Sequence, residues 1–130
     1  MSTSHPFAQE GFDLMAAAFE VHQEQGGGLS EDIYQECLEL ELEMRSIPFS
    51  SQKELAVFYK GQRLKKYYIP DLLVCEHIVV ELKAVAALAP EHEAQLFNYM
   101  RITQKPVGYL INFAPIPKVE WKRFVLSEFA

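Results

Sequence analysis

The sequence has little of what membrane and secreted proteins carry. No apolar run approaches the roughly 20 residues that cross a bilayer, so we expect no membrane partner. The N-terminal stretch MSTSHPFAQEGFD lacks a basic region followed by an apolar one, so we expect no secretory signal. Cys37 and Cys75 lack metal-type spacing. A structural disulfide between them is disfavoured, which indicates a reducing, cytoplasmic location.

Positive charge is also scarce. The chain has 12 Lys and Arg against 18 Asp and Glu, a net charge of −6, whereas nucleic-acid-binding domains are usually basic. Two considerations reduce this objection. Carboxylates that hold a divalent metal are neutralised in use. Basic residues also cluster in Lys60–Lys66, while many of the acidic residues lie in Glu31–Glu43. The basic cluster is either a phosphate contact or a solvated turn.

The length of 130 residues leaves room for one domain and little else. Hydrophobic residues make up 49% of the chain, enough to fill a globular core. No repeat, low-complexity tract or linker divides the sequence. We therefore expect a loose arm over residues 1–9 and one domain over 10–130.

Helical periodicity dominates the first part of that domain. A helix is predicted over 12–25, ended by three glycines, and a second helix runs from an N-cap at Ser30 to about Arg45. Each has an apolar stripe that is expected to face the core. The stripes are Phe12, Met15, Phe19 and His22 in the first helix, and Ile33, Cys37, Leu40 and Met44 in the second, with Tyr34 and Leu38 beside it.

The pattern then changes to strands. Residues 50–59, 64–74 and 78–82 are predicted as three strands, 90–103 as a helix and 107–113 as a buried strand. The tail, 118–129, is predicted as a last strand or a short helix. The order α-α-β-β-β-α-β predicts a single mixed α/β domain, with a central sheet flanked by helices.

Three charged residues interrupt the apolar strands. Asp71 opens one strand, and Glu81 and Lys83 lie in the next, within an apolar segment that is costly to charge unless the charges pair or bind metal. Strand alternation places Glu81 and Lys83 on one face. Two carboxylates supply the hard oxygen ligands that suit Mg²⁺ or Mn²⁺, and the lysine can hold an attacking water. The alternative is a buried ion pair of Lys83 with Glu81 or Asp71, without chemistry.

This site requires a particular strand register. Asp71 and Glu81 share a face of an antiparallel hairpin only if the loop between the strands has an odd length, such as Cys75-Glu76-His77, or if a bulge intervenes. A regular two-residue turn would oppose Asp71 to Leu82 and put Glu81 on the other face. We therefore predict the odd loop.

The arrangement Pro-Asp…Glu-x-Lys, formed by Pro70-Asp71 and Glu81-Leu82-Lys83, resembles the PD-(D/E)XK nuclease superfamily. The segment 28–34, Gly-Leu-Ser-Glu-Asp-Ile-Tyr, is similar to the signature of the small bacterial GxxExxY proteins, and the similarity extends over residues 19–113. The resemblance implies a restriction-endonuclease-like fold with an αβββαβ core. It also implies that Asp71 and Glu81 hold the metal and that Lys83 is the catalytic lysine.

The resemblance implies roles for four further residues. Gln95 and Tyr99 match the Gln-x-x-x-Tyr motif of RecB-type exonucleases, which supports the site and contacts nucleic acid. Their spacing puts them on one helix face, and we expect that face to lie near Lys83. Glu31 would be an additional acid in the metal shell, and His22 the histidine that some relatives add to it.

Two of these assignments have structural alternatives that involve no metal. Glu31 lies beside the apolar arc of its predicted helix, which favours an inward role, but it is equally placed to interact with the positive helix end. Glu41 falls within the same arc and is a rival for the inward acid. His22 continues an apolar stripe, and a satisfied core histidine is the better-supported alternative to a ligand.

Together these features predict a metal-dependent phosphodiesterase that acts on DNA, with RNA as the second choice of substrate. The rival class is a non-catalytic interaction module that keeps the fold and a residual metal site. The acidic balance favours the module, and the intact Asp71, Glu81 and Lys83 favour the enzyme. The sequence leaves open the strandedness of the substrate, and whether a homodimer or another protein partner is involved.

Overall fold

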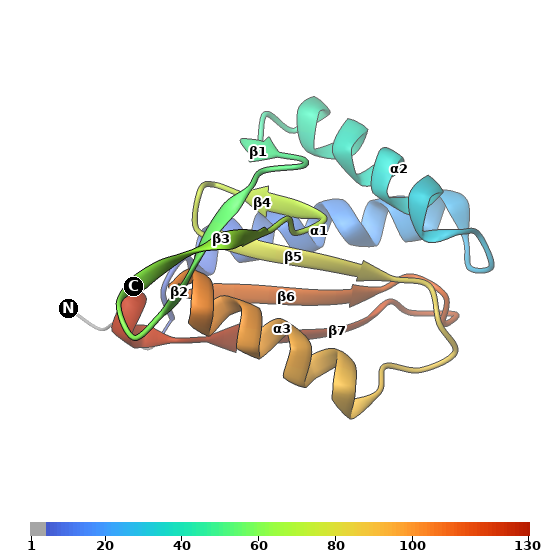
Figure 1. Cartoon of the computed structure of the whole chain (residues 1–130). Helices are drawn as coiled ribbons and strands as arrows, with labels where there is room; N and C mark the ends of the chain where they lie inside the picture. The colour runs from blue at the N-terminus through green and yellow to red at the C-terminus, as the bar shows by residue number, and fades with distance from the viewer. Residues whose placement is uncertain (1–4) are drawn as a thin grey trace.

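A five-stranded sheet with helices on both faces forms the body of the molecule (Figure 1), in a computed structural model that describes residues 5–130. The sheet order is β1-β4-β5-β6-β7, and only β5 and β6 run parallel. Strands β2 and β3 form a separate hairpin. The mixed α/β fold is thus confirmed.

The elements are α1 (Ala8–Gln25), α2 (Glu31–Met44), β1 (Phe49–Ser50), β2 (Leu55–Tyr59), β3 (Gln62–Tyr68), β4 (Leu72–Val74), β5 (Ile78–Lys83), α3 (Pro90–Thr103), β6 (Val107–Asn112), β7 (Glu120–Val125) and a 3₁₀ turn (Ser127–Phe129).

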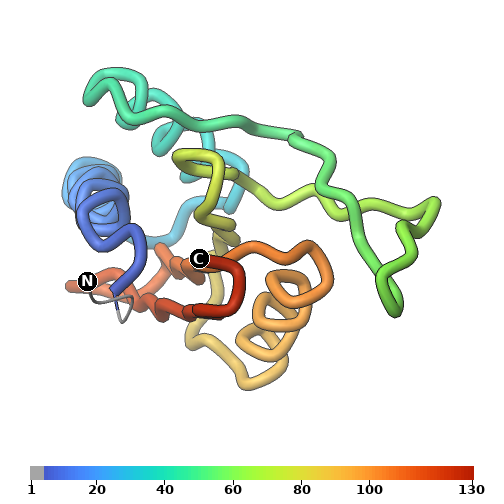
Figure 2. The backbone as a smooth tube through the Cα atoms, turned by 90° about the vertical axis from the view of Figure 1, so that its left-hand side faces the viewer, coloured from blue at the N-terminus to red at the C-terminus, as the bar shows by residue number. Residues whose placement is uncertain are grey.

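Side chains that alternate along the central strands feed two cores, one on each face of the sheet. Helices α1 and α2 cover one face, and α3 and the β2–β3 hairpin lie on the other (Figures 1 and 2). Strand β5 divides its residues between them: Ile78, Val80 and Leu82 join the first core, while Val79 joins the second. Glu81 and Lys83 share the face of Val79 and therefore lie on the α3 side.

The helix boundaries agree with the predicted ones except at the N-terminus. Helix α1 begins at Ala8, four residues before the predicted start, so the end of the predicted loose arm is helical. Phe7 packs on the core and stacks on His77, with ring centroids 4.6 Å apart. Residues 1–4 of the predicted arm lie outside the described residues.

The predicted inward stripes of α1 and α2 are partly wrong. In α1 the large side chains Phe12 and Phe19 are exposed, and the core is filled by neighbours such as Leu14 and Val21, alongside Met15 and His22. In α2 the stripe next to the predicted one is buried, namely Tyr34, Leu38 and Leu42, while Ile33, Leu40 and Met44 are exposed. Both helices carry apolar residues on more than one face, so periodicity alone did not identify the buried face.

Two predicted strands are each split between the two sheets. The predicted strand 50–59 becomes β1 and β2, separated by polar residues and by Gln52 with a left-handed φ of 57°. The predicted strand 64–74 becomes β3 and β4, separated at Pro70, which has no N–H to donate to a ladder. The predicted tail contains both alternatives, strand β7 and a 3₁₀ turn. No helix within residues 5–130 is long and apolar enough to span a membrane.

Tyr34 fastens the glycine-rich turn between α1 and α2. Its hydroxyl donates to the carbonyl of Gly26 at 2.6 Å and accepts from the N–H of Leu29 at 3.2 Å. Its ring is fully buried and stacks on Phe113, with centroids 4.7 Å apart. Gly28 has a φ of +90°, which favours glycine. The glycine and the tyrosine of the segment 28–34 thus have a structural role that does not depend on any activity.

Removing the Tyr34 hydroxyl tests this fastening. Tyr34→Phe keeps the ring stacked on Phe113 but leaves two backbone groups without their partner. We expect the free energy of unfolding to fall by about 1–2 kcal/mol, measured by urea denaturation. Tyr59→Phe, at the exposed tip of the hairpin, is the matched control and should leave stability unchanged. Equal stability of both variants would contradict the proposed role of the hydroxyl.

Candidate active site

The turn between β4 and β5 sets the register that the site requires. Cys75 and Glu76 have left-handed φ values of 52° and 68°, and His77 donates to the carbonyl of Val74 at 3.3 Å. The loop thus contains three residues, and Val74 lies opposite Ile78. The same register pairs Leu72 with Val80 and places Asp71 opposite Glu81. The prediction of an odd loop is confirmed.

Asp71 and Glu81 are held against each other by backbone and side-chain donors. The N–H of Leu82 donates to Oδ2 of Asp71 at 2.7 Å, which continues the ladder after the main-chain pairing of β4 and β5 ends. The N–H of Asp71 donates to Oε1 of Glu81 at 3.3 Å, and the hydroxyl of Tyr68 donates to the same oxygen. Both carboxylates are therefore fixed on one face of the sheet.

The environment of the two carboxylates disfavours their charge. Burial, and next the charge of Asp71, raise the pKa of Glu81 to about 7. Burial also raises the pKa of Asp71, and the charge of Asp32 adds to the effect. Hydrogen bonds and the charge of Lys83 act in the opposite direction at both groups. Two desolvated acids side by side create a local demand for positive charge.

Lys83 lies near both acids without pairing with either. Among residues 5–130 the sole ion pair within 4.0 Å joins Arg45 and Glu41, so the predicted alternative of a contact ion pair involving Lys83 is not observed. Lys83 follows Glu81 on the same face of β5. Its ammonium is thus close enough to influence the acids and remains available to another ligand.

An open cleft of about 320 Å³ adjoins the acids, between α3 and the end of β3. Glu81 and Lys83 line it from β5, and Gln95 and Tyr99 line it from α3. Asp71 lies beside Glu81 but outside the lining. The predicted position of Gln95 and Tyr99 close to Lys83 is therefore observed, and their four-residue spacing gives them a shared helix face.

Tyr68 is a site residue that sequence reasoning missed. It is buried, donates to Glu81, and stacks on Tyr99 with ring centroids 3.8 Å apart. Burial, and next the charge of Glu81, raise the pKa of Tyr68 well above its usual value, so it stays protonated and acts as a donor. Tyr99 thus supports Glu81 through Tyr68. The signal in the sequence was an aromatic residue directly before Ile69-Pro70-Asp71.

Asn112 is a second residue that was missed, and it positions the segment leading to α3. It lies opposite Lys83 in the β5–β6 register and is fully buried. Its amide accepts from the N–H of Val85 at 3.0 Å and donates to the carbonyl of Val85 at 2.8 Å. Glu120 accepts from Asn112 and from the N–H of Leu88. These bonds hold the connection that brings α3 over the end of β5.

The acids of α2 are arranged differently from the prediction. Glu31 is exposed, so the predicted inward orientation is wrong, and Ser30 makes no side-chain cap. Asp32, the next residue, is the acid of this turn whose charge raises the pKa of Asp71. The rival acid Glu41 pairs with Arg45 at 2.7 Å. Gln35 of α2 donates a hydrogen bond to the carbonyl of Asp71 at 2.9 Å.

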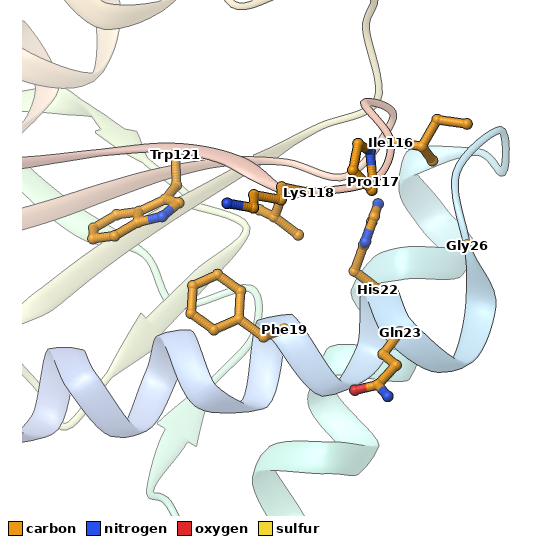
Figure 3. Close-up of a pocket in the computed structure, with 9 residues that line it drawn as sticks. Phe19, His22, Gln23, Gly26, Ile116, Pro117, Lys118 and Trp121 are labelled. Atoms are coloured by element: carbon orange, nitrogen blue, oxygen red, sulfur yellow. The ribbon is translucent and has the colours of Figure 1, made fainter.

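His22 has the environment of a satisfied core histidine. It is 6% exposed, and its Nε2 donates to the carbonyl of Pro115 at 2.8 Å. Figure 3 shows its ring pointing toward the loop at Ile116 and Pro117, beside a cavity of about 770 Å³ that Phe19 and Trp121 also line. This cavity is the larger one, but none of its lining residues is an acid. The cleft with Glu81 and Lys83 is therefore the candidate active site.

Comparison with known proteins agrees with this geometry. A family model described as the PD-(D/E)XK nuclease superfamily matches residues 8–124, which include every strand residue of the site. The chain belongs to the PD-(D/E)XK nuclease superfamily. No curated protein matches it. Nucleases of this superfamily act on nucleic acid and generally use divalent metals.

A solved structure has a similar fold. The protein described as "Crystal structure of SSO0001" superimposes with a TM-score of 0.55 at 19% sequence identity. The match covers 72% of this chain and 50% of the other, so the chain spans half the length of that protein. At this identity the likeness concerns the fold alone.

The donor set fits a divalent metal of the kind this superfamily uses. Within residues 5–130 no protein group donates a hydrogen bond to Oδ1 of Asp71 or to Oε2 of Glu81, so each acid keeps one oxygen for another ligand. No three His, Cys, Asp or Glu side chains in the described part of the chain gather as an all-protein cage. Mg²⁺ is commonly held by one or two carboxylates with waters and substrate phosphates. Asp71 and Glu81 would hold it here.

The raised pKa of Glu81 predicts how the metal-free protein responds to pH. An acid with a higher pKa in the folded state binds a proton at a pH where the unfolded chain has lost it, so stability falls as pH rises from the ordinary value of 4.5 through about 7. We compare the wild type with Glu81→Gln in the presence of a metal chelator. Between about pH 6 and about pH 8, the unfolding free energy of the wild type should fall by about 1 kcal/mol more than that of the variant. Parallel pH profiles of the two proteins would contradict this.

Proposed function

We propose that the chain is a metal-dependent phosphodiesterase that cleaves nucleic acid in the cleft beside Asp71, Glu81 and Lys83. The observation that carries the proposal is the pair of desolvated acids in register on adjacent strands, with a lysine near both and in contact with neither. Such a pair is costly for stability, and a bound cation removes that cost. The proposed substrate class is DNA ahead of RNA.

Each residue has a distinct part in this proposal. Asp71 and Glu81 would hold Mg²⁺ or Mn²⁺, which when bound polarises a phosphate oxygen and makes a neighbouring water more acidic. Lys83 would orient the attacking water and balance charge as the phosphate becomes pentavalent. Tyr68 keeps Glu81 aimed at the cleft, and Tyr99 holds Tyr68 in place by stacking.

Finer assignments belong to the same proposal. Gln95, in the cleft wall, would contact the nucleic acid, as in the RecB-type motif that Gln95 and Tyr99 match. Grouping the chain with the GxxExxY proteins rests on Gly28, Glu31 and Tyr34. Cys37 and Cys75 are free thiols, which suits the reducing, cytoplasmic location that we propose.

Substitution of Asp71 tests the metal site. Asp71→Asn keeps an oxygen that can accept from Leu82 but removes one anionic ligand. We expect loss of the Mn²⁺-dependent rise in thermal midpoint, and a fall in nuclease rate of at least about 100-fold. Without metal the variant should be at least as stable as the wild type, because carboxylate repulsion is relieved. The matched control is Glu36→Gln, which makes the same kind of change, acid to amide, at an exposed position.

Substitution of Lys83 separates catalysis from a purely structural role. Lys83→Ala should keep the Mn²⁺-dependent thermal shift and lose turnover, because the proposed role of the lysine is in the transition state. If Lys83 only compensates the acids, its loss should instead destabilise the domain by roughly 3–5 kcal/mol. That result, together with no Mn²⁺ shift in the wild type, would refute the enzyme and favour the interaction module.

A further inference from the structure

The β2–β3 hairpin concentrates positive charge on an acidic protein. We define the basic hairpin as residues 53–68. It contains five of the twelve Lys and Arg residues and one of the eighteen acids, a net charge of +4, whereas the rest of the chain carries −10. Its basic residues are Lys53, Lys60, Arg63, Lys65 and Lys66, and all five are exposed. The overall charge of −6 therefore does not describe the surface that a phosphate chain would meet here.

Strand β3 of the basic hairpin is open to solvent and ends at the cleft, while β2 packs against α3. Every residue of β3 before Tyr68 is exposed, although alternation should bury half of them in a packed sheet. Figure 2 shows the hairpin, in green, extending from the side of the sheet that also carries α3. At the end of this strand, Tyr67, Tyr68 and Ile69 form one wall of the cleft. The basic side chains of β3 are thus followed, along the same segment of chain, by residues that line the cleft together with Glu81 and Lys83.

Exposed aromatic rings accompany the basic side chains. Tyr67, at the mouth of the cleft, is 54% exposed, and Tyr59, at the hairpin tip, is 61% exposed. Leaving both rings exposed is unfavourable for the free protein, because their apolar faces are in contact with water. Rings of this kind stack on unpaired bases, while lysine and arginine follow the phosphates. The combination matches single-stranded nucleic acid, because the bases of an intact duplex are already stacked on each other.

The size of the cleft agrees with a single strand. Its volume of about 320 Å³ is at the lower end of the range for small-molecule pockets, so it can hold a group of nucleotide size and is too small to enclose a double helix. We propose that the basic hairpin binds single-stranded nucleic acid, or a single-stranded end, and leads it into the cleft. This inference rests on the proposed function for its direction, since the strand enters where the scissile phosphate would lie.

The first test measures binding without cleavage. The full chain is titrated, in chelator, into a fluorescein-labelled single-stranded DNA of about 20 nucleotides and into a blunt duplex of the same length, with anisotropy as the readout. The single strand should bind more tightly. Lys65→Gln combined with Lys66→Gln should weaken binding by about tenfold or more and lower the slope of log Kd against log salt by about 1.4, since each single-strand phosphate contact contributes about 0.7.

A matched pair of lysines provides the control. Lys118→Gln combined with Lys122→Gln removes the same charge from exposed positions in and beside β7. This pair should leave affinity and salt slope close to those of the wild type. An equal loss in both pairs would show a general charge effect and would overturn the proposal, as would equal or tighter binding of the duplex.

Substitution of Tyr67 tests stacking separately from charge. Tyr67→Leu should weaken binding of the single strand by about tenfold without changing the salt slope, and Tyr67→Phe should restore it. Failure of Tyr67→Phe to restore binding, or an unchanged affinity of Tyr67→Leu, would remove Tyr67 from the proposed path and overturn the stacking argument.

Cleavage assays with Mn²⁺ distinguish this inference from the proposed function. If the wild type cleaves DNA and the lysine variants bind and cleave as well as it does, the hairpin inference fails while the nuclease stands. If nothing is cleaved but binding still depends on Lys65 and Lys66, the nuclease fails while the hairpin remains a single-strand binding surface.

Discussion

The alignment of Asp71 with Glu81 is the constraint on which the rest of the site depends. It follows from the three-residue turn at Cys75–His77, because a turn shorter by one residue would send one of the acids to the opposite face. Once aligned, the two acids are both desolvated, which raises the pKa of each and makes a nearby positive charge favourable. Backbone N–H groups and the hydroxyl of Tyr68 fix their positions but donate to only one oxygen of each. This leaves the carboxylates rigid and still able to bind a cation.

The fold separates opposite charges around this centre. Helix α2, which carries six acidic residues, covers one face of the sheet, and the basic hairpin lies on the other face beside α3. A polyanion would be repelled by the first surface and attracted by the second, so the charge distribution selects a direction of approach. The net charge of −6 is then compatible with a nucleic-acid substrate, because only the local surface along the path needs to be basic.

Sequence reasoning predicted the site better than the helix faces. Asp71, Glu81 and Lys83 stood out because charge in an apolar strand is costly, and that cost does not depend on knowing the fold. Gln95 and Tyr99 were expected near Lys83 because only six residues separate β5 from α3, and the structure places them there. The inward stripes of α1 and α2 were predicted only in part, since apolar residues occur on several faces of each helix and only packing decides which is buried. Glu31 was misplaced for the same reason.

The sequence by itself determined the class of fold, the two carboxylates, the lysine and the odd turn that aligns them. These are local properties: strand alternation, loop length and the cost of isolated charge. Only the tertiary structure decided that Tyr68 holds Glu81, that Asn112 tethers the segment before α3, and that β3 leaves the sheet to form a basic arm. Each of these depends on contacts between residues distant in the chain. Such contacts are fixed when the two cores pack, and no local pattern encodes them.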